Sequence, residues 1–149
     1  MGHLVRMHRE PPKIPEEELG GMVNQVIEVL SSYLEGYVPK RPANTKHSIM
    51  GPVGKLLSAM EANRFSTVDG YVGYTVNIHH NTGVRDPDVN QIESLKKGVS
   101  LLIEIKGKVD PSRWKRILRE VDYAIYFRKL KRIVETSKKK DKGEGDGNG

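Results

Sequence analysis

The sequence predicts a helix-rich α+β fold in one small domain, with a short β element and a long basic helical segment at the C-terminus. Three patterns support this prediction. Apolar residues recur at three- and four-residue steps over residues 16–35, which is typical of an amphipathic helix. Strand-forming residues gather at 71–79 and 99–106, and cationic residues follow a helical pattern after residue 110.

The chain of 149 residues has the size of one domain. Prolines at 11, 12 and 15 break any regular helix near the N-terminus, so we expect a flexible Pro-rich arm over residues 1–15. The globular domain is expected to span 16–137. The Lys-, Gly- and Asp-rich residues 138–149 are expected to be a disordered tail.

In the first half of the chain, the acidic run Glu16–Glu18 favours a helix start, and Gly36 ends the predicted helix. The composition of residues 39–47 predicts a loop. A second helix is expected from Pro52 to about Asn63.

The middle of the chain gives two alternatives. Ser66 or Thr67 could cap a short helix, but the β-branched and aromatic residues of 71–79 favour a strand. Asp86-Pro87 then predicts a short helix that ends near Gly98. Residues Val99 to Lys106 are expected to form a strand.

Asp110-Pro111 opens the last predicted helix, which places Trp114, Leu118, Val121 and Ile125 on one apolar stripe. The apolar pattern changes phase near Asp122. Either the helix breaks and residues 123–127 form a short strand, or it continues with apolar surface on two sides, the second meeting a partner subunit.

The composition excludes several kinds of protein. Without cysteine the chain has no disulfide, thiolate zinc site or cysteine nucleophile. No apolar run approaches the roughly 18 residues that span a bilayer, so no membrane contact is expected. The N-terminus lacks the apolar core of a signal peptide, and we therefore expect a cytoplasmic protein.

Positive charge is concentrated near the C-terminus. Residues 1–112 carry 13 cationic and 13 anionic side chains, whereas residues 113–140 carry 11 and 3. Such a patch attracts the phosphates of nucleic acids, with a solvated helix face or an acidic protein partner as alternatives. The candidate nucleic-acid-binding residues are Arg113, Lys115, Arg116, Arg119, Arg128, Lys129, Lys131 and Arg132, together with Lys40, Arg41 and Lys46 of the loop.

Three aromatic residues interleave with this patch. Tyr123, Tyr126 and Phe127 could stack bases of single-stranded DNA or RNA, or pack in the core. The adjacent His79 and His80 would point to opposite faces of a regular strand and so would not chelate one metal ion. We expect turn or surface histidines there.

One group of acidic and lysine residues indicates a catalytic site. Glu104-x-Lys106, preceded by Pro87-Asp88, resembles the acidic–x–Lys signature of restriction-endonuclease-like nucleases, and residues 97–108 look like the corresponding strand of archaeal Holliday-junction resolvases. That resemblance implies Mg²⁺ held by Asp88 and Glu104, with Lys106 assisting the attack on phosphate. Outside this alternative, no metal or other cofactor is expected.

Two other stretches resemble the small subunit of the archaeal type I-A CRISPR interference (Cascade) complex. Residues 53–60 leading to Asn63-Arg-Phe-Ser-Thr-Val-Asp69 are similar to that family's helix and the segment after it, and residues 114–133 to its closing basic helix. The resemblance implies a largely helical, non-catalytic subunit of an antiviral ribonucleoprotein that contacts guide RNA or single-stranded DNA. Its partners would be nucleic acid and neighbouring subunits, with self-association possible, and a basic protein-interaction module is a further alternative.

Overall fold

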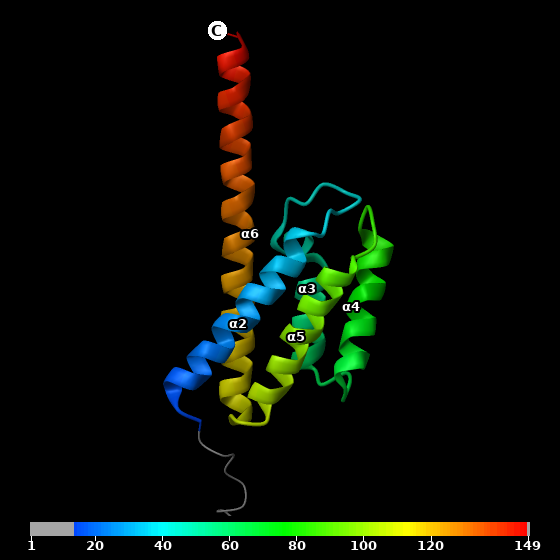
Figure 1. Cartoon of the computed structure of the whole chain (residues 1–149), viewed down its shortest axis with the longest axis vertical. Coiled ribbons are helices and arrows are strands. Elements are labelled where there is room, and N and C mark those ends of the chain that lie inside the picture. The colour runs from blue at the N-terminus through cyan, green and yellow to red at the C-terminus, as the bar shows by residue number, and fades with distance from the viewer. Residues whose placement is uncertain (1–13, 149) are drawn as a thin grey trace, which may run out of the picture.

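A computed structural model describes the backbone of residues 14–148 and the side chains of residues 14–138. This part of the chain contains five helices and no strand (Figure 1). The helices are α2 (Glu16–Glu35), α3 (Lys46–Glu61), α4 (Val68–Thr82), α5 (Val89–Lys106) and α6 (Pro111–Asn148). The predicted α+β fold is therefore wrong, while most of the predicted arm, residues 1–13, lies outside the described residues. None of these helices is both long and apolar enough to cross a lipid bilayer.

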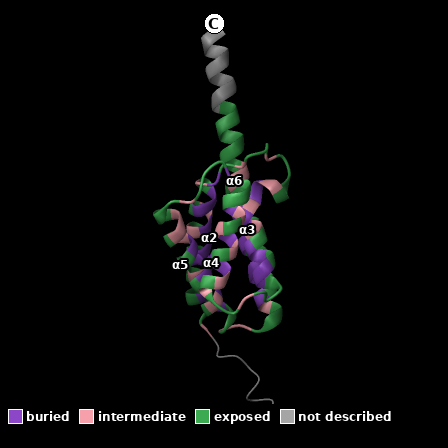
Figure 2. Cartoon of the chain, turned by 90° about the vertical axis from the view of Figure 1, so that its right-hand side faces the viewer, coloured by how far each residue is buried: buried purple, intermediate pink, exposed green. Residues whose placement is uncertain are grey.

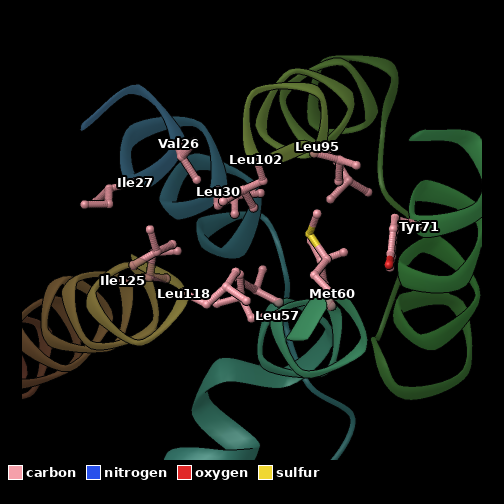
Figure 3. Close-up of a cluster of buried hydrophobic side chains, with 14 of the residues drawn as sticks. Val26, Ile27, Leu30, Leu57, Met60, Tyr71, Leu95, Leu102, Leu118 and Ile125 are labelled. Atoms are coloured by element: carbon pink, nitrogen blue, oxygen red, sulfur yellow. The ribbon is translucent and has the colours of Figure 1, made fainter. Parts of the chain in front are cut away.

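Helix α2 packs against α5 and α6, and also contacts α3. Its bounds agree with the prediction. Helix α3 packs against both α4 and α6, which closes the bundle around one core. All five helices contribute to this core, with Leu30, Leu57, Tyr71, Leu102 and Leu118 among the side chains that meet there (Figure 3).

Helix α3 begins earlier than predicted. The hydroxyl of Thr45 accepts a hydrogen bond from the Ser48 amide at 3.1 Å, and the Ser48 hydroxyl accepts one from the Thr45 amide, so Lys46 becomes the first helical residue. The helix is kinked at Gly51, whose φ of 50° lies in the region that favours glycine. Pro52 then starts the second helical segment, at the position where the prediction placed the beginning of the helix.

Helix α4 replaces the predicted strand at 71–79. The Thr67 hydroxyl caps it by accepting from the Gly70 amide at 3.0 Å, which agrees with the capping alternative. Tyr71, Thr75 and His79 follow at four-residue steps on the buried side. The Thr75 hydroxyl donates to the Tyr71 carbonyl at 2.8 Å, so this β-branched residue satisfies its polar group inside the helix. Helical packing thus overrides the local strand propensity.

Helix α5 replaces two predicted elements, the short helix ending near Gly98 and the strand at 99–106. Its N-cap is Asp88 rather than Asp86, with Asp88 and Gln91 forming a reciprocal capping box. Gly98 does not end the helix but lies in its interior, against Leu30 of α2. Because Leu95, Val99 and Leu102 share one buried face, the apolar run 99–103 belongs to a helix and not to a strand.

Helix α6 is continuous through residues 123–127, so the strand alternative there is wrong. Trp114, Leu118, Val121 and Ile125 all face the core, as predicted. The helix runs to Asn148 and projects well beyond the bundle (Figure 1). Residues 131–138 are exposed along this projection (Figure 2).

Candidate nucleic-acid interface

The basic residues of α6 divide into two groups, and the first of them binds acidic residues of α2. Arg113 makes two hydrogen bonds to the Glu16 carboxylate, at 2.6 and 2.7 Å. Arg128 lies 2.8 Å from a carboxylate oxygen of Glu28. These pairs hold α6 against α2, so their charge is largely neutralised before any ligand arrives.

Two further basic residues of α6, Lys129 and Arg132, bind to the C-terminal end of α2. Glu35 pairs with Arg132 at 3.4 Å and with Lys129 at 4.0 Å. The Lys129 ammonium also donates to the Leu34 carbonyl at 3.3 Å, near the C-terminus of α2. A cation at this position interacts favourably with the helix dipole. Four of the predicted nucleic-acid-binding residues therefore contact α2.

The second group faces solvent. Lys115, Arg116, Arg119 and Lys131 are exposed, and within the described side chains no carboxylate forms an ion pair with them. These four positions remain candidates for contact with an external anion.

The three predicted cations of the 39–47 loop also separate. Lys40 donates to the Asn81 carbonyl at 3.3 Å near the end of α4, and Arg41 is exposed nearby in sequence. Lys46 instead forms an ion pair with Asp122 of α6. This hydrogen bond raises the pKa of Lys46 above its ordinary value, so its positive charge is secured. Folding brings only Lys46 to the basic helix.

Lys46 lies at a cleft of about 500 Å³ between α3 and α6. Met50, Leu57 and Leu118 give this α3–α6 cleft an apolar part. Its charged lining consists of Lys46, Lys55, Arg119, Glu61 and Asp122, and His47 and Tyr74 also line it. Lys55 and Arg119 lie more than 60 residues apart in the sequence, which is why the cleft could not be seen in the sequence pattern.

Tyrosines lie at and beside the cleft. The Arg64 guanidinium lies 5.0 Å from the ring centroid of Tyr74, and its Nη1 donates to the Tyr74 hydroxyl at 3.4 Å. On the α6 side, the Lys46 ammonium lies 4.5 Å from the ring centroid of Tyr123 and 5.6 Å from that of Tyr126. Tyr126 is half-buried, whereas Tyr123 and Phe127 are exposed and stack on each other. The cleft thus combines cations with aromatic rings.

The residues of the predicted nuclease centre are not brought together. Asp88 caps the N-terminus of α5, whereas Glu104 lies in its last turn, about 24 Å away at 1.5 Å of helix rise per residue. Lys106 donates to the side chain of Asn63. A separation of that size prevents Asp88 and Glu104 from holding one ion. Among the described residues, no group of three His, Asp or Glu side chains is arranged to hold a metal.

The prediction of turn or surface histidines is wrong for His79. This side chain is fully buried, with Nδ1 at 2.7 Å from the Tyr33 hydroxyl and its ring packed edge-on against Tyr33 and Tyr37. Burial lowers the pKa of His79, because the charged form loses its hydration. His80 is exposed and pairs with Asp86 at 2.6 Å. The four-residue spacing of Tyr71, Thr75 and His79 is the signal that could have revealed the buried histidine.

Comparisons with known proteins give no relative for this chain: no family model, curated protein or solved structure matches it.

Proposed function

We propose that this protein binds single-stranded DNA or RNA in the α3–α6 cleft and acts as a non-catalytic subunit of a larger assembly. The observation that carries the proposal is the convergence of Lys46, Lys55 and Arg119 from two helices onto one cleft beside tyrosine rings. Lys55 and Arg119 supply charges that no described carboxylate neutralises. Each phosphate that they contact releases counterions, which favours binding at low salt.

The aromatic residues favour a single strand over a duplex. Tyr74 lines the cleft and Tyr126 lies beside it, under Lys46. Only unpaired bases can turn a ring face toward such side chains, and each stacked base contributes about 1–3 kcal/mol. Cations for the backbone and rings for the bases are the two components of binding without strong sequence preference.

The proposed assembly is a CRISPR-type antiviral ribonucleoprotein, in keeping with the resemblance to the type I-A small subunit. The segment that carries part of this resemblance forms the second half of α3 and the turn that leads into α4. Lys55 belongs to this segment, and Tyr74 lies five residues after its end. The resemblance and the cleft therefore concern one region of the molecule. The nuclease alternative has no comparable support, because Asp88 and Glu104 lie at opposite ends of α5.

The test compares two double variants with equal loss of charge. Lys55→Ala/Arg119→Ala removes cations of the cleft, whereas Arg128→Ala/Arg132→Ala removes cations that pair with α2. Binding of labelled single-stranded DNA, RNA and duplex DNA is measured by fluorescence anisotropy across a salt series. We expect the cleft variant to bind more weakly and its salt slope to fall by about 1.4, at about 0.7 per lost phosphate contact on a single strand. The control variant should keep the slope of the unmodified protein.

Aromatic participation has its own comparison. Tyr74→Leu should weaken single-strand binding without changing duplex binding, while Tyr74→Phe should preserve both, because phenylalanine keeps the ring face. Equal losses in the cleft and control variants would refute the cleft as the site. Mg²⁺-dependent cleavage of the nucleic acid, seen on a denaturing gel, would support the nuclease alternative. Absence of binding to every nucleic acid would favour a basic protein-interaction module.

A further inference from the structure

Helix α6 carries exposed apolar surface that continues beyond the α3–α6 cleft, although Tyr123 at its start also lies under Lys46. Among the described residues, seven large apolar side chains are exposed, and four of them lie on α6 between residues 123 and 134. They are Tyr123, Phe127, Ile133 and Val134. Contiguous exposed apolar surface of this kind marks an interaction site in soluble proteins.

Three of these residues, Tyr123, Phe127 and Val134, have the spacing of a coiled coil together with Leu130 and Ser137. Tyr123, Phe127, Leu130, Val134 and Ser137 follow at alternating steps of four and three, so we name them the α6 seam. At about 100° per residue, all five lie within about 40° of the direction opposite Trp114, which faces the core. A helix placed on the α6 seam would therefore lie on the far side of α6 from the bundle.

We propose that the α6 seam binds the seam of a second copy of this chain, as a parallel two-stranded coiled coil. The two bundles would lie on opposite sides of the helix pair and would not collide. In a parallel pair each seam residue meets its own copy. Phe127 and Val134 then occupy heptad positions of type a and Leu130 one of type d, and Val at type a with Leu at type d favours two strands.

The charges beside the α6 seam permit this arrangement. Two cations of this segment, Arg128 and Arg132, pair with Glu28 and Glu35 of the same chain. In the parallel register Lys131 faces Tyr126 of the other copy, and Lys138 faces Ile133. The lysine stems can cover these apolar residues while their ammonium groups stay in water. An antiparallel pair would instead oppose Lys131 to Lys138 of the other copy.

The second copy also explains how the projecting part of α6 is stabilised. Residues 131–138 are exposed, and the C-terminal part of α6 extends past the bundle (Figure 2). Isolated helices of this length are marginal in water and gain most of their stability from packing of an apolar face. The seam spans two heptads, so we expect association that depends on concentration.

The test is the mass of the full chain in solution, measured by sedimentation equilibrium over a wide concentration range. We expect twice the chain mass of 16.8 kDa at high concentration. Leu130→Glu/Val134→Glu should remain monomeric at every concentration, because it places charge within the α6 seam, and it should lose helix content only in the projecting part of α6. The single-charge control Thr136→Glu places its carboxylate on the opposite side of α6 and should still dimerise. A monomer throughout, a larger oligomer, or dissociation of the control would overturn the proposal.

Cysteine cross-linking tests the parallel register, since the native chain has no cysteine. Leu130→Cys and Ser137→Cys should each give an intermolecular disulfide on mild oxidation, because both positions meet themselves only in a parallel pair. Thr136→Cys should not. Cross-linking between Leu130→Cys and Ser137→Cys chains, without cross-linking of either variant alone, would show an antiparallel pair and refute the register.

Discussion

The contact between α2 and α5 can be tested by comparing two glycines in helix interiors. Gly98 lies at this contact, whereas Gly73 lies away from it in α4. A Cβ atom added at Gly98 would lie 2.7 Å from Cδ2 and 2.9 Å from Cγ of Leu30, a fully buried side chain. A Cβ atom added at Gly73 of α4 would meet nothing within 4 Å. The same substitution, Gly to Ala, therefore meets a close contact in one helix and open space in the other.

The two effects can be separated by comparing the variants. Replacing glycine by alanine inside a helix stabilises by about 0.5–1 kcal/mol, and this gain is common to both positions. Overpacking a filled core costs about 1–3 kcal/mol, and this cost applies only at Gly98. We expect Gly73→Ala to stabilise, and Gly98→Ala to be less stable than Gly73→Ala by about 1–3 kcal/mol.

Urea unfolding followed by circular dichroism measures both free energies of unfolding. The double variant Leu30→Val/Gly98→Ala adds a check, because a smaller side chain at position 30 should relieve part of the overpacking and make the two changes less than additive. If Gly98→Ala stabilises as much as Gly73→Ala, the close approach of α2 and α5 at this glycine is refuted.

Two further predictions concern the buried histidine and the start of α3. Because burial lowers the pKa of His79 below its ordinary value of 6.5, the unfolded chain takes up this proton more readily. Stability contributed by neutral His79 should thus be complete above pH 6.5 and decline as the pH falls below it. Urea midpoints at several pH values should show this decline in the exposed-site control His80→Gln and a flatter profile in His79→Gln. Thr45→Ala should cost about 1 kcal/mol in the same assay, since it removes the acceptor for the Ser48 amide; an unchanged midpoint would contradict the capping role.

The elements predicted correctly are those whose signals are local. Glu16–Glu18 and Gly36 mark the ends of α2, and Asp110-Pro111 marks the start of α6. A cap or a proline acts within one helical turn, so its effect can be recognised from neighbouring residues. The core stripe of α6 follows in the same way from a regular spacing on a single helix.

The two predicted strands failed because local propensity does not decide a buried segment. In residues 71–79 the aromatic and β-branched residues pack equally well on a helix face once α3 and α5 lie beside it. In residues 99–106 the apolar run is short enough to fit either structure. The helix that contains Leu95 continues through Gly98 into this run because the absence of a side chain at Gly98 lets α2 pack closely against it.

By itself, the sequence determined that the chain is basic toward its C-terminus and that its last helix has apolar residues on two sides. Only the tertiary structure decided which charges remain for a ligand, because ion pairing depends on neighbours that are distant in sequence. Glu16, Glu28 and Glu35 of α2 engage four basic residues of α6, whereas Arg119 and Lys55 both line the cleft and form no ion pair among the described side chains. Charge is a property of each residue, but its availability depends on what the fold places beside it.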